Sequence, residues 1–361
     1  MNTKPAGELS APQRREGPLR IVLIGGGSGL STLLQGLKAY ASPDTEGAAG
    51  APFGPQPLVD LTAIVTVADD GGSSGRLRRD FKVLAPGDIR NCMVALSEDE
   101  ALLSRLFQYR FASGRGLKGH SFGNLFLTAL TNVTGDFAQA VKVSSEVLAI
   151  AGRIYPSTAT NVGLEAELEN GKKVSGETKI SKSRARIRRV GLIPTRCMPL
   201  EETLRAIAAA DLISLGPGSL FTSVIPNLLV EGIPEAIASA PAVKAYFVNL
   251  MWQPGETMDF TAADHVNALK EHAGGNLLDY VVVNTRPIGS ALLTKYAQQR
   301  ALAVTNDFDR LNGLGVKIVG RDLLEEGEKI RHDPAATALV AIELAAEGRR
   351  RRQKENIPTG S

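Results

Sequence analysis

The sequence RIVLIGGGSGL occupies residues 20–30, and it decides the fold. Arg20 to Ile24 is a short apolar run that leads directly into the glycine loop Gly25–Gly29. The leucines that follow Gly29 recur at helical spacing, so the pattern predicts a strand, a tight turn and a helix that starts at the loop. This junction leaves unpaired N–H groups at the positive end of a helix, where a phosphate group binds well.

Phosphate contact is the function we predict for this loop, and a turn that only packs the helix on the strand is the alternative. Glycine suits the contact because any Cβ would hold the anion away from the backbone. The match to the dinucleotide fingerprint is imperfect, since its third glycine position is Leu30. The predicted phosphate contacts here are Gly25, Gly26, Gly27, Ser28 and Gly29.

The order strand, loop, helix recurs along the chain. Leu61–Val67, Leu212–Leu215, Ala245–Leu250 and Tyr280–Val283 are further apolar, β-branched runs. Continuous apolar strands that alternate with helices indicate a parallel sheet covered on both faces. We therefore predict a Rossmann-like three-layer α/β fold. Residues 162–191 differ, because alternating polarity flanks an Asn-Gly pair, which predicts a small antiparallel β-hairpin insertion.

A second loop follows the second predicted strand and has the sequence DDGGSSGR. Two carboxylates at a strand end could reach ribose hydroxyls or hold Mg²⁺ against a diphosphate. The glycines could form an anion-binding nest with Arg76 as counter-charge. The alternative is an Asp-Gly turn with a serine cap. The candidates are Asp69, Asp70, Gly71, Gly72, Ser73, Ser74 and Arg76, with Asp69 and Asp70 as candidate metal ligands.

Four more loops place small or polar residues beside apolar helices or strands. Pro86–Asn91 is a rigid turn, with Asp88 as a helix cap in the simplest interpretation. Gly119–Asn124 contains His120, and a single histidine in a loop more often makes a structural hydrogen bond than acts as a general base. Gly216–Ser219 repeats the first loop at another strand end, with Ser219 as the expected N-cap. Asn249–Thr257 holds Trp252, which either stacks on a ring or packs.

Composition narrows the class of protein. The 361 residues carry 41 Lys and Arg against 38 Asp and Glu, a balance that does not suggest a dedicated nucleic-acid binder. Two cysteines cannot form a paired Cys-x-x-Cys zinc site and make a disulfide framework improbable, which favours a reducing compartment. No P-loop is present, and nothing identifies a nucleophile or general base.

The ends and one insertion differ in composition from the rest. We expect residues 1–18 to form a disordered leader, residues 43–57 a flexible insertion and residues 348–361 a basic disordered tail, around a single domain at 19–347. No apolar stretch approaches the roughly 20 residues that cross a bilayer. The leader also lacks the apolar stretch of a signal peptide, so we expect a cytoplasmic protein.

Several long motifs occur together and in order. They are GGGSGLSTLLQGLK, IVTVADDGGSSGRLR, LAPGDIRNC, GHSFGNLFLTAL, SLGPGSLFTSVIPNLLV, NLMWQPGET and KIRHDP. Together they resemble the gluconeogenesis factor (YvcK-type) family, which is related to the 2-phospho-L-lactate transferases of coenzyme F420 synthesis. The resemblance runs from about Leu19 to Leu344, and the chain departs from the family in the insertion and in the basic C-terminal run.

The resemblance implies a Rossmann-like sheet with nucleotide phosphates above the strand ends. It implies a UDP-sugar ligand, UDP-N-acetylglucosamine among the candidates, and support of gluconeogenic growth and cell shape through the cell-wall precursor pathway. NAD(P) is also associated with this fold. Carried over by motif, Asn91, Asn124, Gly216, Gly218 and Ser219 join the two glycine loops in the cleft. Tyr296 and Arg331 are assigned to the uridine or sugar, with packing at a helix end and pairing to Asp333 as their alternatives.

Three functions follow, in order of preference. The first is a ligand-sensing regulator that binds a UDP-sugar and signals to a protein partner in carbon or cell-wall metabolism, with a homo-oligomer as an open option. The second is a Mg²⁺-dependent transferase of a phosphorylated group from a nucleotide diphosphate. The third is an NAD-dependent oxidoreductase, which has the fold but lacks the third glycine.

Overall fold

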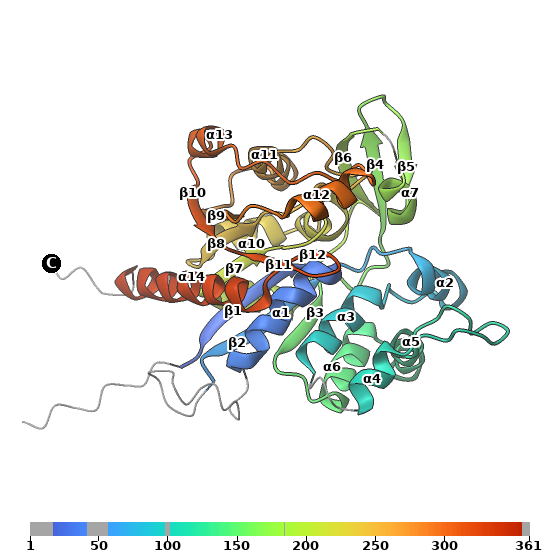
Figure 1. The fold of residues 1–361 in the computed structure, drawn as a ribbon. Coiled ribbons are helices and arrows are strands. Elements are labelled where there is room, and N and C mark those ends of the chain that lie inside the picture. Colours follow the sequence, from blue (N-terminus) through green and yellow to red (C-terminus); the bar gives the residue numbers. More distant parts are fainter. Residues whose placement is uncertain (1–16, 42–56, 98–101, 184, 356–361) are drawn as a thin grey trace, which may run out of the picture.

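A computed structural model describes residues 17–41, 57–97, 102–183 and 185–355. A seven-stranded sheet runs through the middle of the molecule, in the order β10-β9-β8-β7-β1-β2-β3 (Figure 1). Every pairing between neighbours in this sheet is parallel. The strands are β1 (Leu19–Gly25), β2 (Val59–Val65), β3 (Arg153–Pro156), β7 (Leu212–Leu215), β8 (Val243–Phe247), β9 (Tyr280–Asn284) and β10 (Lys317–Arg321).

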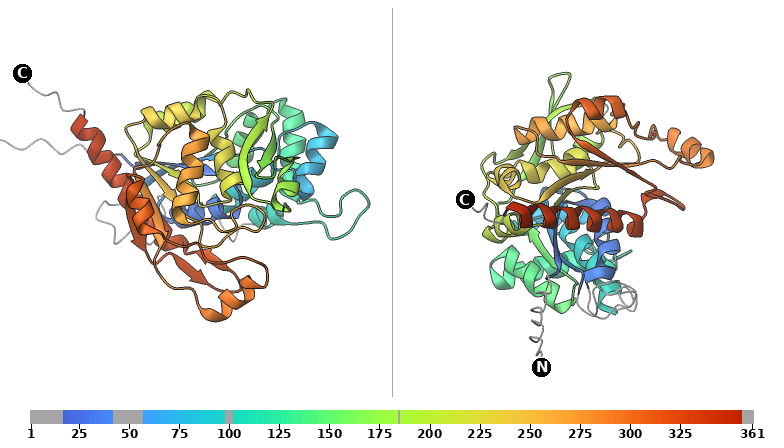
Figure 2. Two further views of the ribbon diagram at one scale, coloured as in Figure 1. Left: turned by 90° about the horizontal axis from the view of Figure 1, so that it is seen from above. Right: turned by 90° about the vertical axis from the view of Figure 1, so that its left-hand side faces the viewer.

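The central strands are buried on both faces, as their continuous apolar runs predict. All four residues of β7 and the last five of β1 are buried. Helices α1 (Gly27–Ala41) and α14 (Pro334–Glu355) contact each other on one face, while α8 (Glu201–Ala209) and α10 (Ile233–Ser239) contact each other on the opposite face (Figure 2). The predicted three-layer Rossmann-like α/β fold is confirmed.

The remaining helices connect the strands. Between β2 and β3 the chain forms α2 (Gly72–Phe81), α3 (Gly87–Leu96), α4 (Leu102–Gln108), α5 (Phe122–Thr134) and α6 (Phe137–Val147). A five-residue π-helix, η2 (Leu220–Val224), and α9 (Ile225–Leu228) follow β7. Next come α11 (Ala262–Ala273), α12 (Ser290–Ala297) and α13 (Phe308–Gly313). A two-stranded hairpin, β11 (Leu324–Glu326) and β12 (Ile330–His332), precedes α14.

The predicted antiparallel insertion is present. Strands β4 (Gly163–Leu168) and β5 (Lys173–Ser175) pair across the Asn170–Gly171 turn. A third strand, β6 (Ile187–Ile193), pairs with the other edge of β4, and the short helix α7 (Glu177–Ser181) lies between β5 and β6. Side chains of β4 alternate between buried and half-buried, as the sequence alternation indicates.

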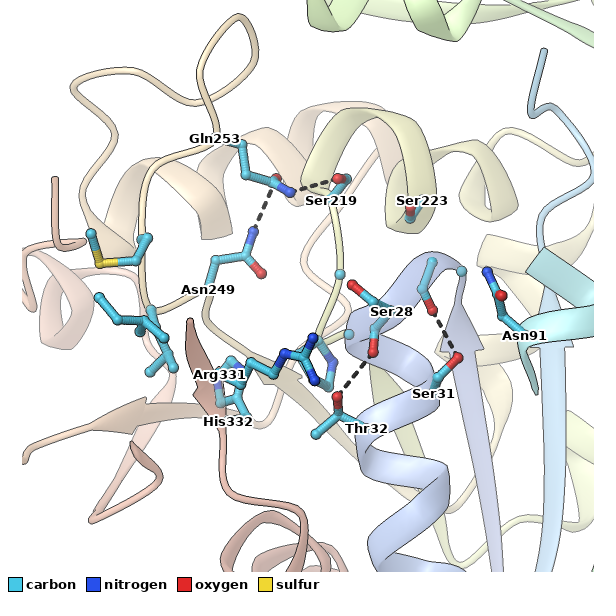
Figure 3. A pocket seen from close by; sticks show the side chains of 18 of the residues that line it. Ser28, Ser31, Thr32, Asn91, Ser219, Ser223, Asn249, Gln253, Arg331 and His332 are labelled. Carbon is cyan, nitrogen blue, oxygen red and sulfur yellow. Dashed lines mark hydrogen bonds between the residues drawn. The ribbon is translucent and has the colours of Figure 1, made fainter. Parts of the chain in front are cut away.

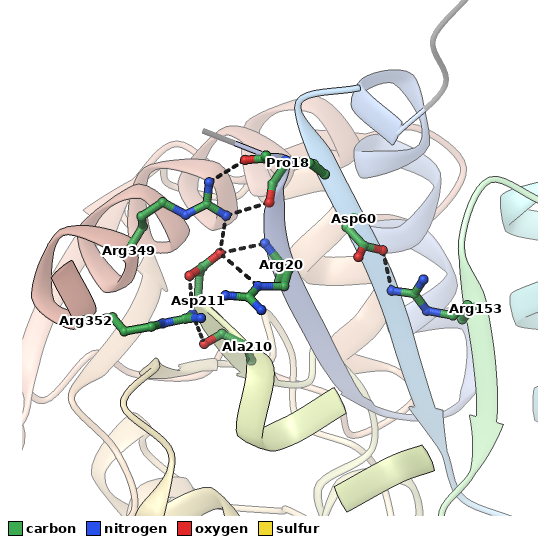
Figure 4. Close-up of polar contacts among 9 residues, drawn as sticks. Pro18, Arg20, Asp60, Arg153, Ala210, Asp211, Arg349 and Arg352 are labelled. Atoms are coloured by element: carbon green, nitrogen blue, oxygen red, sulfur yellow. Dashed lines mark hydrogen bonds and ion pairs between the residues drawn. The ribbon is translucent and has the colours of Figure 1, made fainter. Parts of the chain in front are cut away.

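The prediction of a disordered tail from Gly348 is wrong for residues 348–355, which continue α14. Asp211 has a fully buried side chain just before β7, and both Arg349 and Arg352 form ion pairs with it (Figure 4). Arg349 also donates to the carbonyl oxygens of Gly17 and Pro18. A buried carboxylate requires a charged partner, and α14 supplies two. Residues 1–16, 42–56 and 356–361, which hold most of the leader and insertion and the end of the tail, lie outside the described residues.

Candidate functional site

The strand order reverses between β1 and β7. From β1 the chain adds strands on one side through β2 to β3, whereas β7, β8, β9 and β10 extend the sheet on the other side. In open α/β sheets, ligands bind at the carboxyl ends of the strands where this reversal occurs. The loops that leave β1 and β7 are Gly25–Gly29 and Gly216–Ser219, so the sheet brings together two of the predicted glycine loops.

Close packing of these two loops depends on Gly29. A methyl group on Gly29 would lie 2.6 Å from the carbonyl oxygen of Pro217 and 2.8 Å from the amide nitrogen of Gly218. Only glycine allows the backbones to approach this closely. Gly27 starts α1 with a positive φ of 66°, a second position where glycine is required.

A cavity of about 910 Å³ opens over the two loops. It is within the size range of ligand pockets in enzymes and binding proteins. Figure 3 shows the side chains that face it from α1, from the start of α3, from the β7 and β8 loops, and from β12. The predicted residues in its lining are Gly26, Gly27, Ser28, Gly29, Asn91, Gly218, Ser219, Tyr296 and Arg331.

A chain of amide and hydroxyl groups organises one wall of this pocket. The side-chain nitrogen of Asn249 donates to the Oε1 atom of Gln253 at 3.3 Å, and the side-chain nitrogen of Gln253 donates to the Ser219 hydroxyl at 2.6 Å (Figure 3). The bond to Gln253 uses one of the two N–H groups of the Asn249 amide and orients its side chain. The opposite oxygen of Asn249 is therefore the atom that can accept a hydrogen bond from a ligand.

The pocket lining carries positive charge. Among the described residues that line it, Arg90 and Arg331 are charged and none is Asp, Glu or Lys. Arg331 extends from β12 toward Ser28 and Thr32 in the first turns of α1 (Figure 3). Burial lowers the pKa of His332 to about 4, and its Nε2 atom bonds the carbonyl oxygen of Val248, so this imidazole is neutral at physiological pH. The lining therefore suits an anionic ligand.

Tyr296 and Arg331, which are distant in sequence, meet at one side of the pocket. The Tyr296 hydroxyl accepts a hydrogen bond from the backbone N–H of Ile330, next to Arg331. The alternative pairing of Arg331 with Asp333 is not found in the described part of the chain, where the Asp333 carboxylate instead accepts from the N–H of Ala336 at the start of α14.

Two asparagines that the resemblance assigned to the cleft have different positions. Asn91 lines the pocket, and its side-chain oxygen accepts from the Arg90 guanidinium at 2.6 Å. Asn124 is buried at the start of α5 and does not line the pocket. Its side-chain oxygen has no hydrogen-bond partner among the described residues.

The second glycine loop lies next to the pocket and outside its lining. Ser73 bonds the Nδ1 atom of His120 at 2.9 Å, and Arg76 donates to the carbonyl oxygen of Lys118. Asp70 faces α7, where its Oδ1 atom accepts from both the N–H and the hydroxyl of Thr178. Through these bonds the loop holds the segments that contain Lys118, His120 and Thr178 in place. The sequence candidates outside the lining are Gly25, Asp69, Asp70, Gly71, Gly72, Ser73, Ser74, Arg76, Asn124 and Gly216.

Three carboxyl groups crowd together behind the first glycine loop. Burial and the nearby Asp69 raise the pKa of Asp88 to about 7, and the Asp88 carboxylate accepts from the N–H of Gly27. Burial, with Asp69 and Asp88 as neighbours, raises the pKa of Glu177 to about 9, and Glu177 shares a hydrogen bond with Asp69. The crowding favours binding of a proton or a cation.

The two carboxylates of this cluster that suit Mg²⁺ are not the Asp69 and Asp70 pair predicted from the sequence. Asp70 is bonded to Thr178, whereas Asp69 lies near Asp88 and also accepts from the N–H of Gly71, so Asp69 and Asp88 are the two carboxylates that could share an ion here. No group of three or more acidic, His or Cys side chains in the described ranges is placed to hold a metal. Mg²⁺ commonly binds one or two carboxylates and completes its shell with phosphate oxygens and water. The pair fits that mode.

Sequence reasoning missed several of these residues. Asn249 and Gln253 lie in the NLMWQPGET motif, and Arg90 lies in LAPGDIRNC, so the motifs themselves were the available signal. The sequence indicates Asp88 only as a helix cap, whereas Pro86 is the N-cap of α3 and the Asp88 carboxylate accepts from the N–H of Gly27. Glu177 had no local signal, because its position beside Asp69 depends on how the small sheet packs on the large one.

Two further findings concern the whole chain. Cys92 and Cys197 are both buried and free. Over the described residues, no single helix has the length and apolar character to cross a membrane; one bent pair, Leu220–Leu228 with Ile233–Ser239, passes by length and composition alone.

Comparison with known proteins gives one consistent result. The family model described as 2-phospho-L-lactate transferase CofD matches residues 21–324. The gluconeogenesis factor of Bacillus subtilis is 46% identical over 329 residues, covering 91% of this chain and 98% of that protein. The gluconeogenesis factor of Halalkalibacterium halodurans is 45% identical, covering 90% and 95%. A crystal structure of a Bacillus halodurans protein superposes with a TM-score of 0.84 at 44% identity, covering 90% of this chain and 99% of that one.

Proposed function

The chain belongs to the gluconeogenesis factor branch of the 2-phospho-L-lactate transferase CofD family, and from this premise we propose that it supports gluconeogenic growth as a regulator that binds a UDP-sugar. The ligand occupies the 910 Å³ pocket at the strand-order reversal. We extend the proposal to control of cell-wall precursor supply and cell shape, through a protein partner in the cytoplasm.

The observation that carries the proposal is the charge of the pocket. Its described lining combines Arg90 and Arg331 with hydroxyl and amide side chains and contains no carboxylate. A diphosphate is stabilised by the N-terminal end of α1, and Arg331 supplies the counter-charge on the opposite wall. The hydroxyl and amide groups, with Asn249 and Ser219 among them, are suited to the ribose, the base and the sugar.

Calorimetry with UDP-N-acetylglucosamine tests the ligand. We expect measurable heat for the wild-type protein and a large loss of affinity for Arg331→Gln. The control is Arg188→Gln, which removes an exposed arginine on the small antiparallel sheet and should bind as the wild type does. NADH and NADPH, titrated in the same way, test the nicotinamide alternative. No heat with any UDP-sugar would exclude this ligand class.

Gly27→Val separates ligand contact from folding. Valine is strained at the positive φ of Gly27, and its side chain would occupy the surface on which the phosphate is proposed to lie. We expect ligand affinity to fall before the variant loses its folded structure. Normal affinity in this variant would mean that the first loop serves only as a turn and does not contact the phosphate.

A second candidate function is supported by the carboxyl cluster. The family model is described as a transferase, and Asp69 and Asp88 lie directly behind the glycine loop. With Mg²⁺ bound there, the ion would neutralise diphosphate oxygens during transfer of a phosphorylated group to an acceptor hydroxyl. Metal-dependent release of UMP from a UDP-linked donor, lost in Asp69→Asn, would establish the enzyme. Tight binding without turnover would favour the regulator.

A further inference from the structure

A loop between α4 and α5 stands out from the body of the molecule. It comprises Tyr109–Lys118 and is the teal segment that projects at the right of Figure 1 and again in the left view of Figure 2. Apart from the half-buried Phe111, every residue of the loop is exposed. Tyr109 is 53% exposed and Leu117, near the tip, is 43% exposed. None of the residues of this loop lines the pocket described above.

The base of the loop is held firmly. The N–H of Phe111 donates to the carbonyl oxygen of His120 at 3.0 Å, and the N–H of Gly119 donates to the carbonyl oxygen of Phe111 at 2.8 Å. Arg76 on α2 donates to the Lys118 carbonyl oxygen, and Arg110 donates to that of Gly119. The loop is therefore a preformed projection, and docking it onto a partner would need little additional ordering.

Within residues 102–135 the side-chain charge has one sign, while Glu98, Asp99 and Glu100 precede this stretch and Asp80 on α2 lies near His120 at the base of the loop. Residues 102–135 contain Arg105, Arg110, Arg115 and Lys118, and contain no Asp or Glu. Two exposed cations, Arg115 toward the tip and Lys118 beside the base of the loop, lie on either side of Leu117. A surface of this kind attracts a densely anionic partner.

Exposed aliphatic side chains accompany these cations. Helix α4, which leads into the loop, leaves Leu102 72% exposed and Leu103 and Leu106 partly so. The buried residues of this helix are Ser104 and Phe107, so the three leucines leave part of their apolar surface uncovered by the described residues. Exposed leucines among cations are the chemistry of an interfacial membrane contact. Nucleic acid, in contrast, is bound mainly by aromatic stacking and phosphate contacts, and the two aromatic rings of the loop, Tyr109 and Phe111, already pack edge-on against each other at a centroid distance of 5.1 Å.

We propose that the Tyr109–Lys118 loop, together with the exposed leucines of α4, docks the protein onto an anionic lipid surface. The lysine and arginine side chains contact headgroup phosphates, while Leu117 enters the boundary between headgroups and acyl chains. This function is separate from ligand binding in the pocket. It requires neither a bound nucleotide nor a membrane-spanning segment.

Vesicle flotation of the full chain tests the proposal. We expect the protein to float with vesicles of equimolar phosphatidylcholine and phosphatidylglycerol and to remain at the bottom with phosphatidylcholine alone. High salt should release it, because exposed charges are screened. Failure of the wild-type protein to float with the anionic vesicles overturns the proposal, as does equal flotation with both lipids.

Variants locate the contact. Each cation near an anionic surface contributes roughly fivefold in affinity, so Arg115→Gln/Lys118→Gln should weaken partitioning by about 25-fold. Leu117→Ser should weaken it by about threefold, because the apolar side chain no longer leaves water. The control Lys172→Gln/Lys173→Gln removes the same number of charges at the exposed start of β5, where Lys173 pairs with Glu165, and should leave partitioning unchanged.

Two outcomes reject the loop as the contact. One is an equal loss of flotation in the control and in Arg115→Gln/Lys118→Gln, which would reflect net charge alone. The other is tight binding of an RNA oligonucleotide, measured by fluorescence anisotropy, without vesicle binding. Thermal unfolding of each variant checks that the fold is intact, so the flotation result reports on the exposed side chains.

Discussion

The Tyr296 hydroxyl accepts a hydrogen bond from the backbone N–H of Ile330 at 3.0 Å and so joins α12 to the strand that carries Arg331. Helix α12 has no buried residues, so this bond is one of few that position it over the pocket. Another joins the Lys295 ammonium to the carbonyl oxygen of Glu328. The two proposed ligand contacts, Tyr296 and Arg331, therefore depend on each other for their positions.

Tyr296→Phe and Arg331→Gln should weaken UDP-sugar binding to different degrees. Loss of one neutral hydrogen bond costs about 1 kcal/mol, so Tyr296→Phe should lower affinity about fivefold. Arg331→Gln removes a charge-assisted contact to the diphosphate, which costs about 2–3 kcal/mol, or roughly 30- to 150-fold. Calorimetry measures both. Tyr109→Phe, at an exposed position outside the pocket, is the control, and a larger loss for Tyr296→Phe than for Arg331→Gln would contradict this ranking.

Gly29→Ala should separate the two glycine loops. Its methyl group would lie 2.6 Å from the Pro217 carbonyl oxygen, and overpacking of this kind costs about 1–3 kcal/mol of unfolding free energy. Ligand affinity should fall as well, because the pocket floor is displaced. Urea unfolding and calorimetry measure the two effects. Gly191→Ala, where a methyl group meets open space, should change neither, and a fully stable Gly29→Ala would show that the loops can move apart freely.

Mg²⁺ should stabilise the protein through Asp69 and Asp88. Burial and, second, repulsion from Asp69 raise the pKa of Asp88, and a bound cation would offset both, so the thermal midpoint should rise on addition of MgCl₂. Asp69→Asn and Asp88→Asn should abolish the rise, whereas Asp70→Asn should retain it, since Asp70 is bonded to Thr178. A loss of the Mg²⁺ response in Asp70→Asn alone would instead support the pair expected from sequence.

Glu256 should make stability depend on pH. Burial raises the pKa of Glu256 from 4.5 to about 7, although the hydroxyls of Ser181 and Thr222 donate to its carboxylate. Since the folded pKa lies above the unfolded value, the folded state retains the proton to higher pH. The contribution is complete below the unfolded pKa and is lost as pH rises through about 7, with a slope of up to about 1.4 kcal/mol per pH unit.

Urea unfolding at several pH values between about 5 and 8 checks this dependence. Glu256→Gln, which resembles the protonated acid, should reduce the slope over that range by up to about 1.4 kcal/mol per pH unit, while Asp88 and Glu177, whose pKa values are also raised, retain the rest. Glu325→Gln, at an exposed position on β11, should leave the profile as in the wild type. An unchanged slope in Glu256→Gln would assign the dependence to other carboxyl groups.

Deletion of residues 349–361 should destabilise the protein strongly. It removes Arg349 and Arg352 from the buried Asp211 carboxylate and leaves Arg20, whose Nε atom lies 3.9 Å away, and loss of the partners of a buried charge costs up to about 3–5 kcal/mol. Deletion of residues 356–361 alone leaves the described contacts of α14 in place and should have little effect. Chemical unfolding of both truncations measures the difference. Equal stability of the two would mean that water replaces the arginines at Asp211.

The local sequence was sufficient to predict several strands and the junction between the first strand, the glycine loop and α1. The strand at Leu212–Leu215 has the predicted bounds, and the glycine loop opens α1 as the helical spacing of its leucines indicates. The Asn170–Gly171 turn closes β4 onto β5, with Gly171 at a positive φ of 77°. These features depend on neighbouring residues, whose backbone preferences and periodicity are visible in the sequence itself.

Tertiary structure alone decided which loops share the pocket and which charges meet. Pairing of β7 with β1 brings Ser219 beside Ser28, and packing of α7 turns Asp70 toward Thr178, 108 residues away. Docking of α14 brings Arg349 to Asp211 across 138 residues, where the sequence suggested a free tail. Such contacts follow from the burial of whole sheet and helix faces. The local sequence of a strand or helix does not indicate which distant element will pack against it.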